Sequence, residues 1–357
     1  MKLQEIDTPA LVLDLDRVEH NISTMARYFA QQSASLRPHF KTPKCAEVPR
    51  LQLEGGAIGV TCAKLGEAEA LADAGVETSV LIANQIVGPA KVTRLAALAQ
   101  RLPELIVAID HASQIEAIDA ELAQSGASVG ALVEVDIGMR RCGTDAPGQT
   151  IDLARRIAAS RIAYRGIMGY EGHAVLVPDD AKRKQLAEAA VKRLLEHRQA
   201  LTDAGLDPSI VSAGGTGTFD ITGSTPGVSE IQAGSYVFMD GAYSRVRRDF
   251  ECALSVITTI VHRRGRVLIT DCGMKALSHD FGLPTGYELP VSCLGLSEEH
   301  GHVGIDEGEE LDLGVGDRIR ILPSHGDTTI NLHERYYALR GDEVEAVWRI
   351  IGRGKFV

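Results

Sequence analysis

Lys41 is the residue in this sequence that is best placed to act as an amine nucleophile. It follows the run Arg37–Phe40, at the carboxyl end of the first strand that the sequence predicts. A lysine is almost never fully buried without a partner, so at a strand end it either reaches solvent or takes part in chemistry. Partial desolvation would lower its pKa and favour Schiff-base formation. Lys44 is a competitor, although it falls past Pro43 and we expect it at the start of the next helix.

A glycine-rich turn, Ser-Ala-Gly-Gly-Thr-Gly-Thr, spans residues 212–218 after the seventh predicted strand. Bare glycine backbone lets amide groups approach and point at an anion, and nearby hydroxyl groups would add donors. The loops after strands seven and eight form a phosphate site in many barrel enzymes. The pattern also occurs in simple turns, but its position favours phosphate binding. The candidate ligands are Gly215, Thr216, Gly217, Gly234 and Ser235.

His325 and Asp327 form a candidate metal-binding pair in the C-terminal part of the chain. In an extended segment, residues two apart project to the same face, so both side chains could reach one ion. An imidazole and a carboxylate suit Mn²⁺ or Mg²⁺ better than a thiolate-preferring metal. The alternative is a local turn in which Asp327 caps the backbone and His325 makes a local hydrogen bond. The segment Glu299–His302 is a second, equally ambiguous cluster.

Two further segments place polar side chains at predicted strand ends. Arg141 lies in the segment that follows the fifth strand, and Tyr170 and His173 lie in the segment that follows the sixth. Together with Lys41 they would supply donors for a phenolate oxygen, a partner for a ring and an acid or base. Each of them alone could be structural, but packing does not explain polar groups on so many strand ends.

The hydrophobic pattern predicts the scaffold that would gather these strand ends. Short apolar runs alternate with amphipathic stretches over the first 240 residues, which is typical of parallel βαβ units. Eight such units favour an α/β fold with a closed (β/α)8 barrel of the TIM type, and the alternative is an open doubly wound sheet. The predicted strands are Leu36–His39, Ala57–Thr61, Ser79–Ala83, Leu105–Ile109, Val129–Val135, Ile162–Met168, Ile210–Ser212 and Ser229–Phe238.

The pattern changes after about residue 245 to short alternating runs separated by turn residues, which predicts a C-terminal antiparallel β domain. The run Thr8–Leu15 also reads as a strand and could pair with that domain. We therefore predict a barrel domain over residues 16–244 and a β domain over 245–357, joined by residues 1–15. The predicted β-domain strands are Cys252–Arg263, Arg266–Thr270, Tyr287–Cys293, Arg318–Leu322, Tyr336–Leu339 and Val344–Ile351.

The composition excludes several classes of protein. With 37 basic and 48 acidic residues, the net charge is −11, and no dense basic run is present that would bind nucleic acid. No apolar stretch reaches the roughly 18 residues of a membrane span, and the N-terminus lacks the apolar run of a signal peptide. The 6 cysteines are far apart and contain no Cys-x-x-Cys motif. We expect a cytoplasmic protein that binds neither nucleic acid nor membrane.

Five motifs occur in order along nearly the whole chain: Arg37-Pro38-His39-x-Lys41-Thr42, Asp136-x-Gly138-Met139-x-Arg141-Cys142-Gly143, the Gly-Gly-Thr-Gly turn, Gln232-Ala233-Gly234-Ser235-Tyr236-x-Phe238-Met239-Asp240, and His325-x-Asp327. In these motifs the chain resembles the fold-type III pyridoxal-phosphate (PLP) enzymes, the alanine racemase-like barrel family. Within that family it is most similar to the branch of D-threonine aldolases and D-serine dehydratases, and closest to the aldolases.

The resemblance implies roles for individual residues. Lys41 looks like the lysine that binds the cofactor covalently, and His325 and Asp327 match the divalent-metal pair of the branch. Two departures affect the expected site: Ala63 stands where related aldolases often carry a glutamine, and Pro43-Lys44 replaces the usual His-Lys. The other implied cofactor contacts are Thr216, Gly234 and Ser235 at the phosphate, Tyr170 and Tyr243, and Arg141 near the phenolate oxygen.

The resemblance implies PLP- and metal-dependent retro-aldol cleavage of β-hydroxy-D-amino acids to glycine and an aldehyde. The alternatives are a dehydratase that gives a 2-oxo acid and ammonia, an amino-acid racemase and a non-catalytic PLP-binding protein. Dehydratases of the branch tend to carry cysteine where this chain has Asp327, so the oxygen ligand favours the aldolase and Mn²⁺ or Mg²⁺ over Zn²⁺. The family also implies a homodimer. A β-carboxylate on the substrate would need a cation, for which Arg245–Arg248 is a weak candidate.

Overall fold

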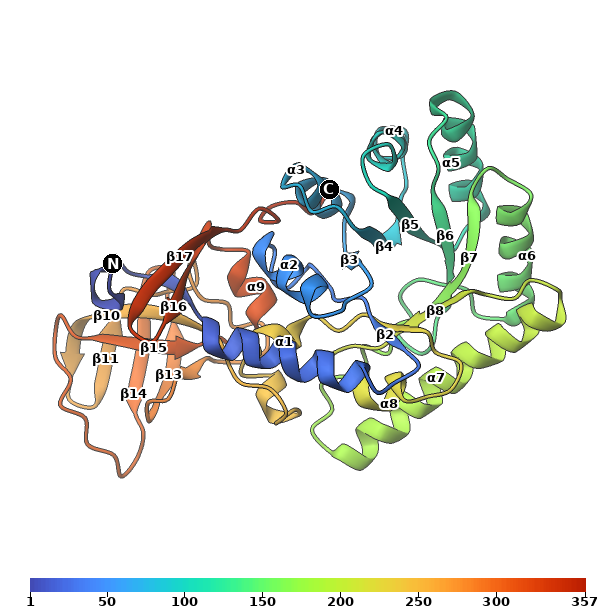
Figure 1. Cartoon of the computed structure of the whole chain (residues 1–357). Helices are drawn as coiled ribbons and strands as arrows, with labels where there is room; N and C mark the ends of the chain where they lie inside the picture. The colour runs from blue at the N-terminus through green and yellow to red at the C-terminus, as the bar shows by residue number, and fades with distance from the viewer. The chain divides into compact units, whose positions relative to one another are not determined.

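The computed structural model describes the whole chain, residues 1–357, and it divides into two compact units (Figure 1). We call them the barrel unit and the β unit and describe each by itself. The barrel unit comprises Met25–Lys41, Val48–Gly234 and Lys355–Val357, and the β unit comprises Met1–Thr24, Thr42–Glu47 and Ser235–Gly354.

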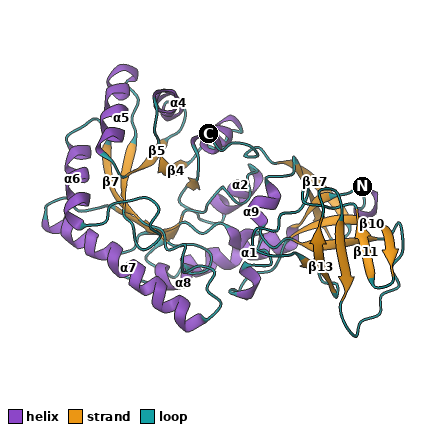
Figure 2. Cartoon of the chain, turned by 180° about the vertical axis from the view of Figure 1, so that it is seen from behind, coloured by secondary structure: helices purple, strands orange, loops and turns teal.

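The barrel unit contains eight parallel strands in the order β2-β9-β8-β7-β6-β5-β4-β3. Amphipathic helices separate consecutive strands, and several of them flank the strands in Figure 2. The strands are β2 (Ser35–Leu36), β3 (Val60–Cys62), β4 (Ser79–Gln85), β5 (Glu104–Ile109), β6 (Gly130–Glu134), β7 (Ala163–Met168), β8 (Ile210–Ala213) and β9 (Glu230–Ile231). The helices along the chain are α1 (Leu15–Phe29), α2 (Glu47–Glu54), α3 (Leu65–Asp73), α4 (Pro89–Ala99), α5 (Ala112–Ser125), α6 (Pro147–Ala158), α7 (Asp180–Asp203) and α8 (Phe219–Gly223).

The two edge strands of this sheet, β2 and β3, are joined by the segment that follows β2. The amide of Phe40 donates to the carbonyl of Thr61 at 2.7 Å, and the amide of Thr61 donates to the carbonyl of Pro38 at 2.8 Å. On its other side, β2 pairs in parallel with β9. The predicted parallel barrel is therefore confirmed, and the open sheet is rejected. The cluster inside the barrel comprises Leu81, Ile106, Ala108, Leu132 and Met168.

A buried ion pair lies at the β2–β9 junction. The side chain of Arg37 is only 4% exposed, and its Nε lies 3.0 Å from both carboxylate oxygens of Glu230. Arg37 also donates to Ser79 Oγ at 2.9 Å, and that hydroxyl donates to Glu104 at 2.6 Å. A Cβ on Gly59 would lie 2.3 Å from Arg37 Nη1, so glycine is needed there. Arg37 thus serves the architecture of the barrel.

The β unit contains a nine-stranded sheet in the order β11-β14-β13-β12-β15-β10-β1-β16-β17. Because β10 also pairs with β11, six of its strands form a closed antiparallel ring. The N-terminal strand β1 pairs with β10 and with β16. The strands are β1 (Ala10–Asp14), β10 (Leu254–Arg264), β11 (Val267–Thr270), β12 (Thr285–Gly286), β13 (Val291–Leu296), β14 (Gly301–Ile305), β15 (Arg318–Leu322), β16 (Arg335–Arg340) and β17 (Glu343–Arg349).

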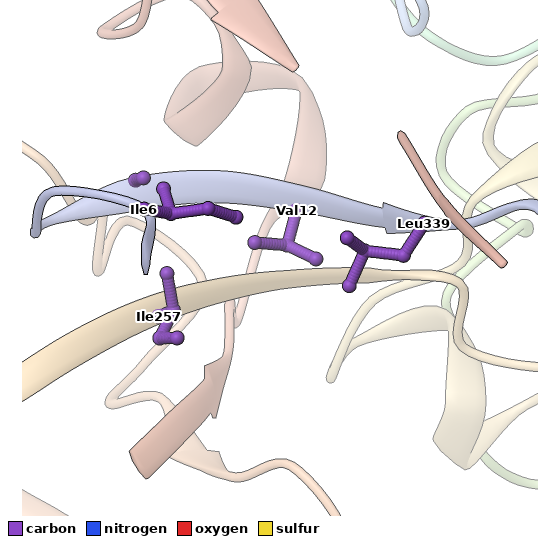
Figure 3. Packing of buried hydrophobic residues seen from close by; sticks show 5 residues of the cluster. Ile6, Val12, Ile257 and Leu339 are labelled. Carbon is purple, nitrogen blue, oxygen red and sulfur yellow. The ribbon is translucent and has the colours of Figure 1, made fainter. Parts of the chain in front are cut away.

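Residues far apart in the sequence form the core around β1. Ile6, Val12, Ile257 and Leu339 pack together with Ala10, and each is at most 5% exposed (Figure 3). This packing explains why an N-terminal segment belongs to the β unit. The boundaries predicted at residues 16 and 245 remain predictions, because compactness does not show which segments fold independently. None of the helices is long and apolar enough to cross a membrane.

Several predicted elements were wrong in extent. Only Glu230–Ile231 of the predicted strand Ser229–Phe238 is extended; the chain then turns, with Ser235–Val237 in a 3-10 helix. The predicted strand Tyr287–Cys293 begins only at Val291, because Glu288 has a φ of 55° and Pro290 lacks an amide hydrogen. The strand β14 was not predicted, since its sequence Gly-His-Val-Gly-Ile has weak strand character.

Lys44 does not begin a helix, contrary to the prediction. It adopts a φ of 48° directly after a turn, and α2 begins only at Glu47. Its Nζ donates to the carbonyl of Gly352 at 3.2 Å, and its own carbonyl accepts from the Gly352 amide at 2.8 Å. These contacts give Lys44 a structural role in the β unit.

Replacing Arg37 by methionine should destabilise the protein, because Glu230 would keep a buried charge without its partner. We expect a loss of about 3–5 kcal/mol in the free energy of unfolding, measured by chemical denaturation. Arg161→Met, which removes a largely exposed ion pair with Asp119, is the control and should change stability little. Equal stability of the two variants would contradict the role given to the buried pair.

Candidate active site

Lys41 directly follows the segment that joins β2 to β3. Its amide lies 3.3 Å from Nδ1 of His39, and the preceding residue, Phe40, is bonded through its amide to Thr61. The amide of His39 donates to the carbonyl of Ala233 at 3.2 Å, which fixes the other side of the same segment. The side chain of Lys41 is half-buried. The barrel therefore fixes the backbone of this lysine at the carboxyl end of its strands.

The glycine-rich turn is buried and tightly folded. Gly214 adopts a φ of 80°, and the amide of Thr218 donates to the carbonyl of Gly215 at 3.1 Å. A Cβ on Gly217 would lie 1.8 Å from the carbonyl oxygen of Val175, so packing alone requires glycine there. The amides of Gly217, Gly234 and Ser235 make no hydrogen bond to other groups of the chain. Buried amides without an acceptor fit an anionic ligand such as a phosphate.

Tyr170 and Arg141 lie together in the barrel unit. The guanidinium carbon of Arg141 is 5.9 Å from the centre of the Tyr170 ring. A Cβ on Gly215 would lie 3.2 Å from Cε2 of Tyr170, so the ring packs against the glycine-rich turn. The structure thus brings together Arg141, Tyr170 and Gly215, three residues that the sequence analysis selected separately.

Glu134, at the end of β6, is a polar neighbour of Arg141 that the sequence analysis missed. One of its oxygens accepts a hydrogen bond from Gln85, and the other lies 4.0 Å from Nη2 of Arg141. Burial raises the pKa of Glu134, while Gln85 and the charge of Arg141 act against that rise. A carboxylate that ends the otherwise apolar strand Gly130–Glu134 was the available sequence signal.

The loop that carries Arg141 is held by two aspartates. Asp136 Oδ1 accepts from the amides of Gly138 at 2.9 Å and Arg140 at 3.0 Å. Asp110 Oδ2 accepts from the amide of Gly143 at 3.0 Å. This bonding fixes the backbone around an exposed arginine. At the Ala63 position, where the sequence departs from the aldolases, the carbonyl oxygen accepts a hydrogen bond from Asn84 at 2.9 Å.

In the β unit, the segment with His325 and Asp327 is not extended, contrary to the prediction. His325 has extended backbone angles, but it precedes the short helix α9 (Gly326–Ile330), which places Asp327 in the first turn. Nδ1 of His325 lies 2.7 Å from Oδ2 of Asp280, and the ring of Phe281 stacks on the imidazole with 4.0 Å between centroids. These contacts orient the imidazole and leave Nε2 as its nitrogen for a further ligand.

Asp240 is hydrogen-bonded to the backbone of the same segment. Its Oδ2 accepts from the amide of Gly326 at 2.8 Å, and its Oδ1 accepts from the amide of Tyr243 at 2.8 Å. Burial raises the pKa of Asp240 to about 6, because its carboxyl is only 1% exposed. One buried carboxyl therefore ties together the backbone of Tyr243 and of the residue between His325 and Asp327.

No group of three or more His, Cys, Asp or Glu side chains is arranged to hold a metal. In the second candidate cluster, Glu299 pairs with Lys275 at 2.5 Å and His302 lies in β14, and a metal at that cluster stays a prediction. His325 and Asp327 would therefore supply two protein ligands, and water or substrate would complete the shell. A hard cation that keeps several waters fits such a pair.

The predicted site residues are divided between the two units. Their roles toward a cofactor or metal remain predictions. Asp280, which orients His325, was not predicted, because it lies 45 residues away in the sequence and no pattern links the two. The barrel unit carries Lys41, Arg141, Tyr170, Gly215, Thr216, Gly217 and Gly234, and the β unit carries Ser235, Tyr243, His325 and Asp327.

Two family models match the chain. The model for the alanine racemase N-terminal domain matches residues 13–241, and the model described as a putative serine dehydratase domain matches residues 253–339. The first match covers more than half of the chain and spans the parallel strands of the barrel.

Characterised relatives align with almost the whole chain. It is 36% identical to 3-hydroxy-D-aspartate aldolase of Paracoccus denitrificans (strain Pd 1222), over 99% of this chain and 94% of the relative. It is 33% identical to D-threonine aldolase of an Arthrobacter species, with the same 99% and 94% coverage. It is 30% identical to D-threo-3-hydroxyaspartate dehydratase of Delftia sp. (strain HT23), over 97% of each chain.

A solved structure agrees with these alignments. The crystal structure of D-threonine aldolase from Filomicrobium marinum superposes with a TM-score of 0.96 at 35% identity, covering 100% of this chain and 98% of that one. Both the barrel and the antiparallel C-terminal architecture are thus those of known proteins. The chain belongs to the alanine racemase N-terminal domain family of fold-type III PLP proteins, as its motifs implied.

Proposed function

We propose that this protein is a PLP- and divalent-metal-dependent aldolase that cleaves β-hydroxy-D-amino acids of the D-threonine type to glycine and an aldehyde. The observation that carries the proposal is that Asp280 orients His325, while the carboxylate of Asp327 follows two residues later in the first turn of α9. The names of the relatives that are 36% and 33% identical support carbon–carbon cleavage. The preference for D substrates comes from the relatives alone.

The barrel unit carries groups that suit PLP. Lys41 would bind its aldehyde carbon, and the amides of Gly217 and Gly234 would meet its phosphate. The other proposed cofactor contacts are Gly215 and Thr216 of the barrel unit and Ser235 and the ring of Tyr243 of the β unit. Arg141, stacked near the ring of Tyr170, would supply a cation for the phenolate oxygen. When bound, the cofactor supplies an electron sink for negative charge at the substrate Cα.

The proposed metal ligands, His325 and Asp327, supply nitrogen and oxygen. This donor set favours Mn²⁺ or Mg²⁺ over Zn²⁺, because the site offers no thiolate. A metal there would lower the pKa of the substrate β-hydroxyl group. With Nδ1–H of His325 donating a hydrogen bond to Asp280, Nε2 would be the imidazole nitrogen that could coordinate such a metal.

Different residues of the chain have separate proposed roles in the cleavage reaction. Lys41 would hold the cofactor through its amine, and the turn around Gly215 would hold the phosphate end. The β-hydroxyl group loses its proton, the Cα–Cβ bond breaks with its electrons retained at Cα, and Cα then takes up a proton. Glycine and an aldehyde leave. Arg141 and Tyr170 would hold the cofactor ring in place.

Dehydration of the same substrates is the second candidate function. It is favoured by the match of residues 253–339 to a putative serine dehydratase domain and by the relative that is 30% identical. In that reaction Cα is deprotonated and the β-hydroxyl group leaves, which gives a 2-oxo acid and ammonia. The oxygen ligand Asp327 makes us prefer the aldolase.

We further propose that the protein is a cytoplasmic homodimer. Its ligand would be the small-molecule substrate, and we expect it to bind neither nucleic acid nor membrane. All six cysteines are free, which suits a reducing compartment. The net charge of −11 disfavours binding to nucleic acid.

The products formed from D-threonine distinguish aldol cleavage from dehydration. Protein stripped with a chelator and reloaded with Mn²⁺ should release glycine and acetaldehyde from D-threonine, and stripped protein should lose most of this activity. The two products would be measured against 2-oxobutanoate. Formation of 2-oxobutanoate without glycine would reject the aldolase in favour of the dehydratase.

Lys41→Ala should abolish the visible chromophore that borohydride reduces, because no other lysine is proposed to bind the cofactor. The measurement is the absorbance spectrum of purified protein before and after reduction. Lys44→Ala is the matched control and should retain the chromophore, since Lys44 is engaged with Gly352. A chromophore that persists without Lys41 would show that the lysine assignment is wrong.

Asp280→Asn should weaken metal binding by about tenfold to a hundredfold, because it removes the charged acceptor that orients His325. Titration of Mn²⁺ into the metal-free protein would measure the change. Asp306→Asn is the control, since Asp306 accepts from Ser292 at 2.8 Å elsewhere in the β unit. Unchanged affinity in Asp280→Asn would argue against a metal at His325.

A further inference from the structure

Glu171 is a fully buried carboxylate that the proposed chemistry does not use. It directly follows Tyr170 after β7, and it is 0% exposed. An acidic side chain close to a proposed phosphate site is unexpected, because like charges repel and a buried charge needs partners. Its surroundings therefore require an explanation.

Three donors from the glycine-rich turn and the helix after it converge on Glu171. Its Oε2 accepts from the amide of Gly214 at 3.1 Å. Its Oε1 accepts from the hydroxyl groups of Thr218 at 2.8 Å and Thr222 at 2.5 Å. These residues lie 43 to 51 positions further along the chain, so the contacts are tertiary. The carboxylate thus has its charge balanced by donors of the turn itself.

A second amide of the turn is tied to Glu171 indirectly. The hydroxyl group of Thr218 accepts from the amide of Gly215 at 3.4 Å while it donates to the carboxylate. The amides of Gly214 and Gly215 therefore both donate hydrogen bonds within the chain. The amide of Gly217 makes no hydrogen bond to another group of the chain.

Packing also holds the turn. A Cβ on Gly217 would lie 1.8 Å from the carbonyl oxygen of Val175, and one on Gly215 would lie 3.2 Å from Tyr170. With these close contacts and the hydrogen bonds to the carboxylate, the turn has little freedom to rearrange. A carboxylate accepts from all three donors at once. An amide side chain has one acceptor oxygen, so the hydroxyl groups of Thr218 and Thr222 would have to reverse from donating to accepting.

We propose that Glu171 is a positioning residue for the cofactor phosphate: its carboxylate fixes the turn Gly214–Thr218 so that the amide of Gly217 stays available to the anion. The inference rests on the proposed function only in taking PLP as the ligand. Glu171 itself touches neither cofactor nor substrate in this proposal; it acts through the turn.

The test compares two ligands that share an aldehyde and differ in the phosphate. Cofactor-free wild-type and Glu171→Gln proteins are titrated with PLP and with pyridoxal. We expect Glu171→Gln to bind PLP about tenfold to a hundredfold more weakly, the loss expected for a disrupted buried hydrogen-bond network. Its affinity for pyridoxal should change less than about threefold, within ordinary mutational scatter.

A second pair of variants keeps the proposal testable if Glu171→Gln fails to fold. Thr218→Val removes the hydroxyl group that links Gly215 to Glu171, and Thr218→Ser retains it. Only Thr218→Val should show the phosphate-selective loss. Equal losses of affinity for PLP and pyridoxal would overturn the proposal and leave Glu171 as a residue that stabilises the fold in general. Unchanged affinity for both ligands would overturn it as well. A wild-type protein that does not prefer PLP over pyridoxal would instead reject the cofactor assignment on which the proposed function rests.

Discussion

The hydrogen bonds that join β2 to β3 and β9 are the constraint on which the barrel unit depends. Arg37 and Glu230 form a buried ion pair at the β2–β9 junction, and the amide of Phe40 bonds to Thr61 on the other side. Lys41 is the next residue, so the contacts that close the barrel also fix the backbone of the proposed cofactor lysine. The motif Arg37-Pro38-His39-x-Lys41-Thr42 therefore contains an arginine that stabilises the barrel and a lysine that we propose binds the cofactor.

Three carboxylates that have no proposed role in the reaction hold other parts of the site in place through hydrogen bonds. Glu171 holds the glycine-rich turn, Asp136 holds the loop before Arg141, and Asp280 orients His325. Each accepts hydrogen bonds from backbone or side-chain donors and so fixes a segment that would otherwise be free to move. Such orientation before a ligand binds reduces the entropy lost in reaching a reactive geometry.

The sequence predicted the barrel because buried parallel strands read as apolar runs between amphipathic helices. It also predicted Lys41, Tyr170 and the glycine-rich turn as features that follow strands, although their roles remain predictions. It did not reveal Glu171 or Asp280, because their partners lie 43 or more residues away and no spacing connects them. The assumption of an extended segment at His325 failed, because α9 begins at the next residue.

We propose that barrel closure makes Lys41 the cofactor-binding lysine. To test this, PLP-loaded protein is reduced with borohydride and digested, and the pyridoxyl label is located by mass spectrometry. We expect a single label on the peptide that contains Lys41, at that residue. A label on Lys44, or one distributed over several surface lysines, would contradict it.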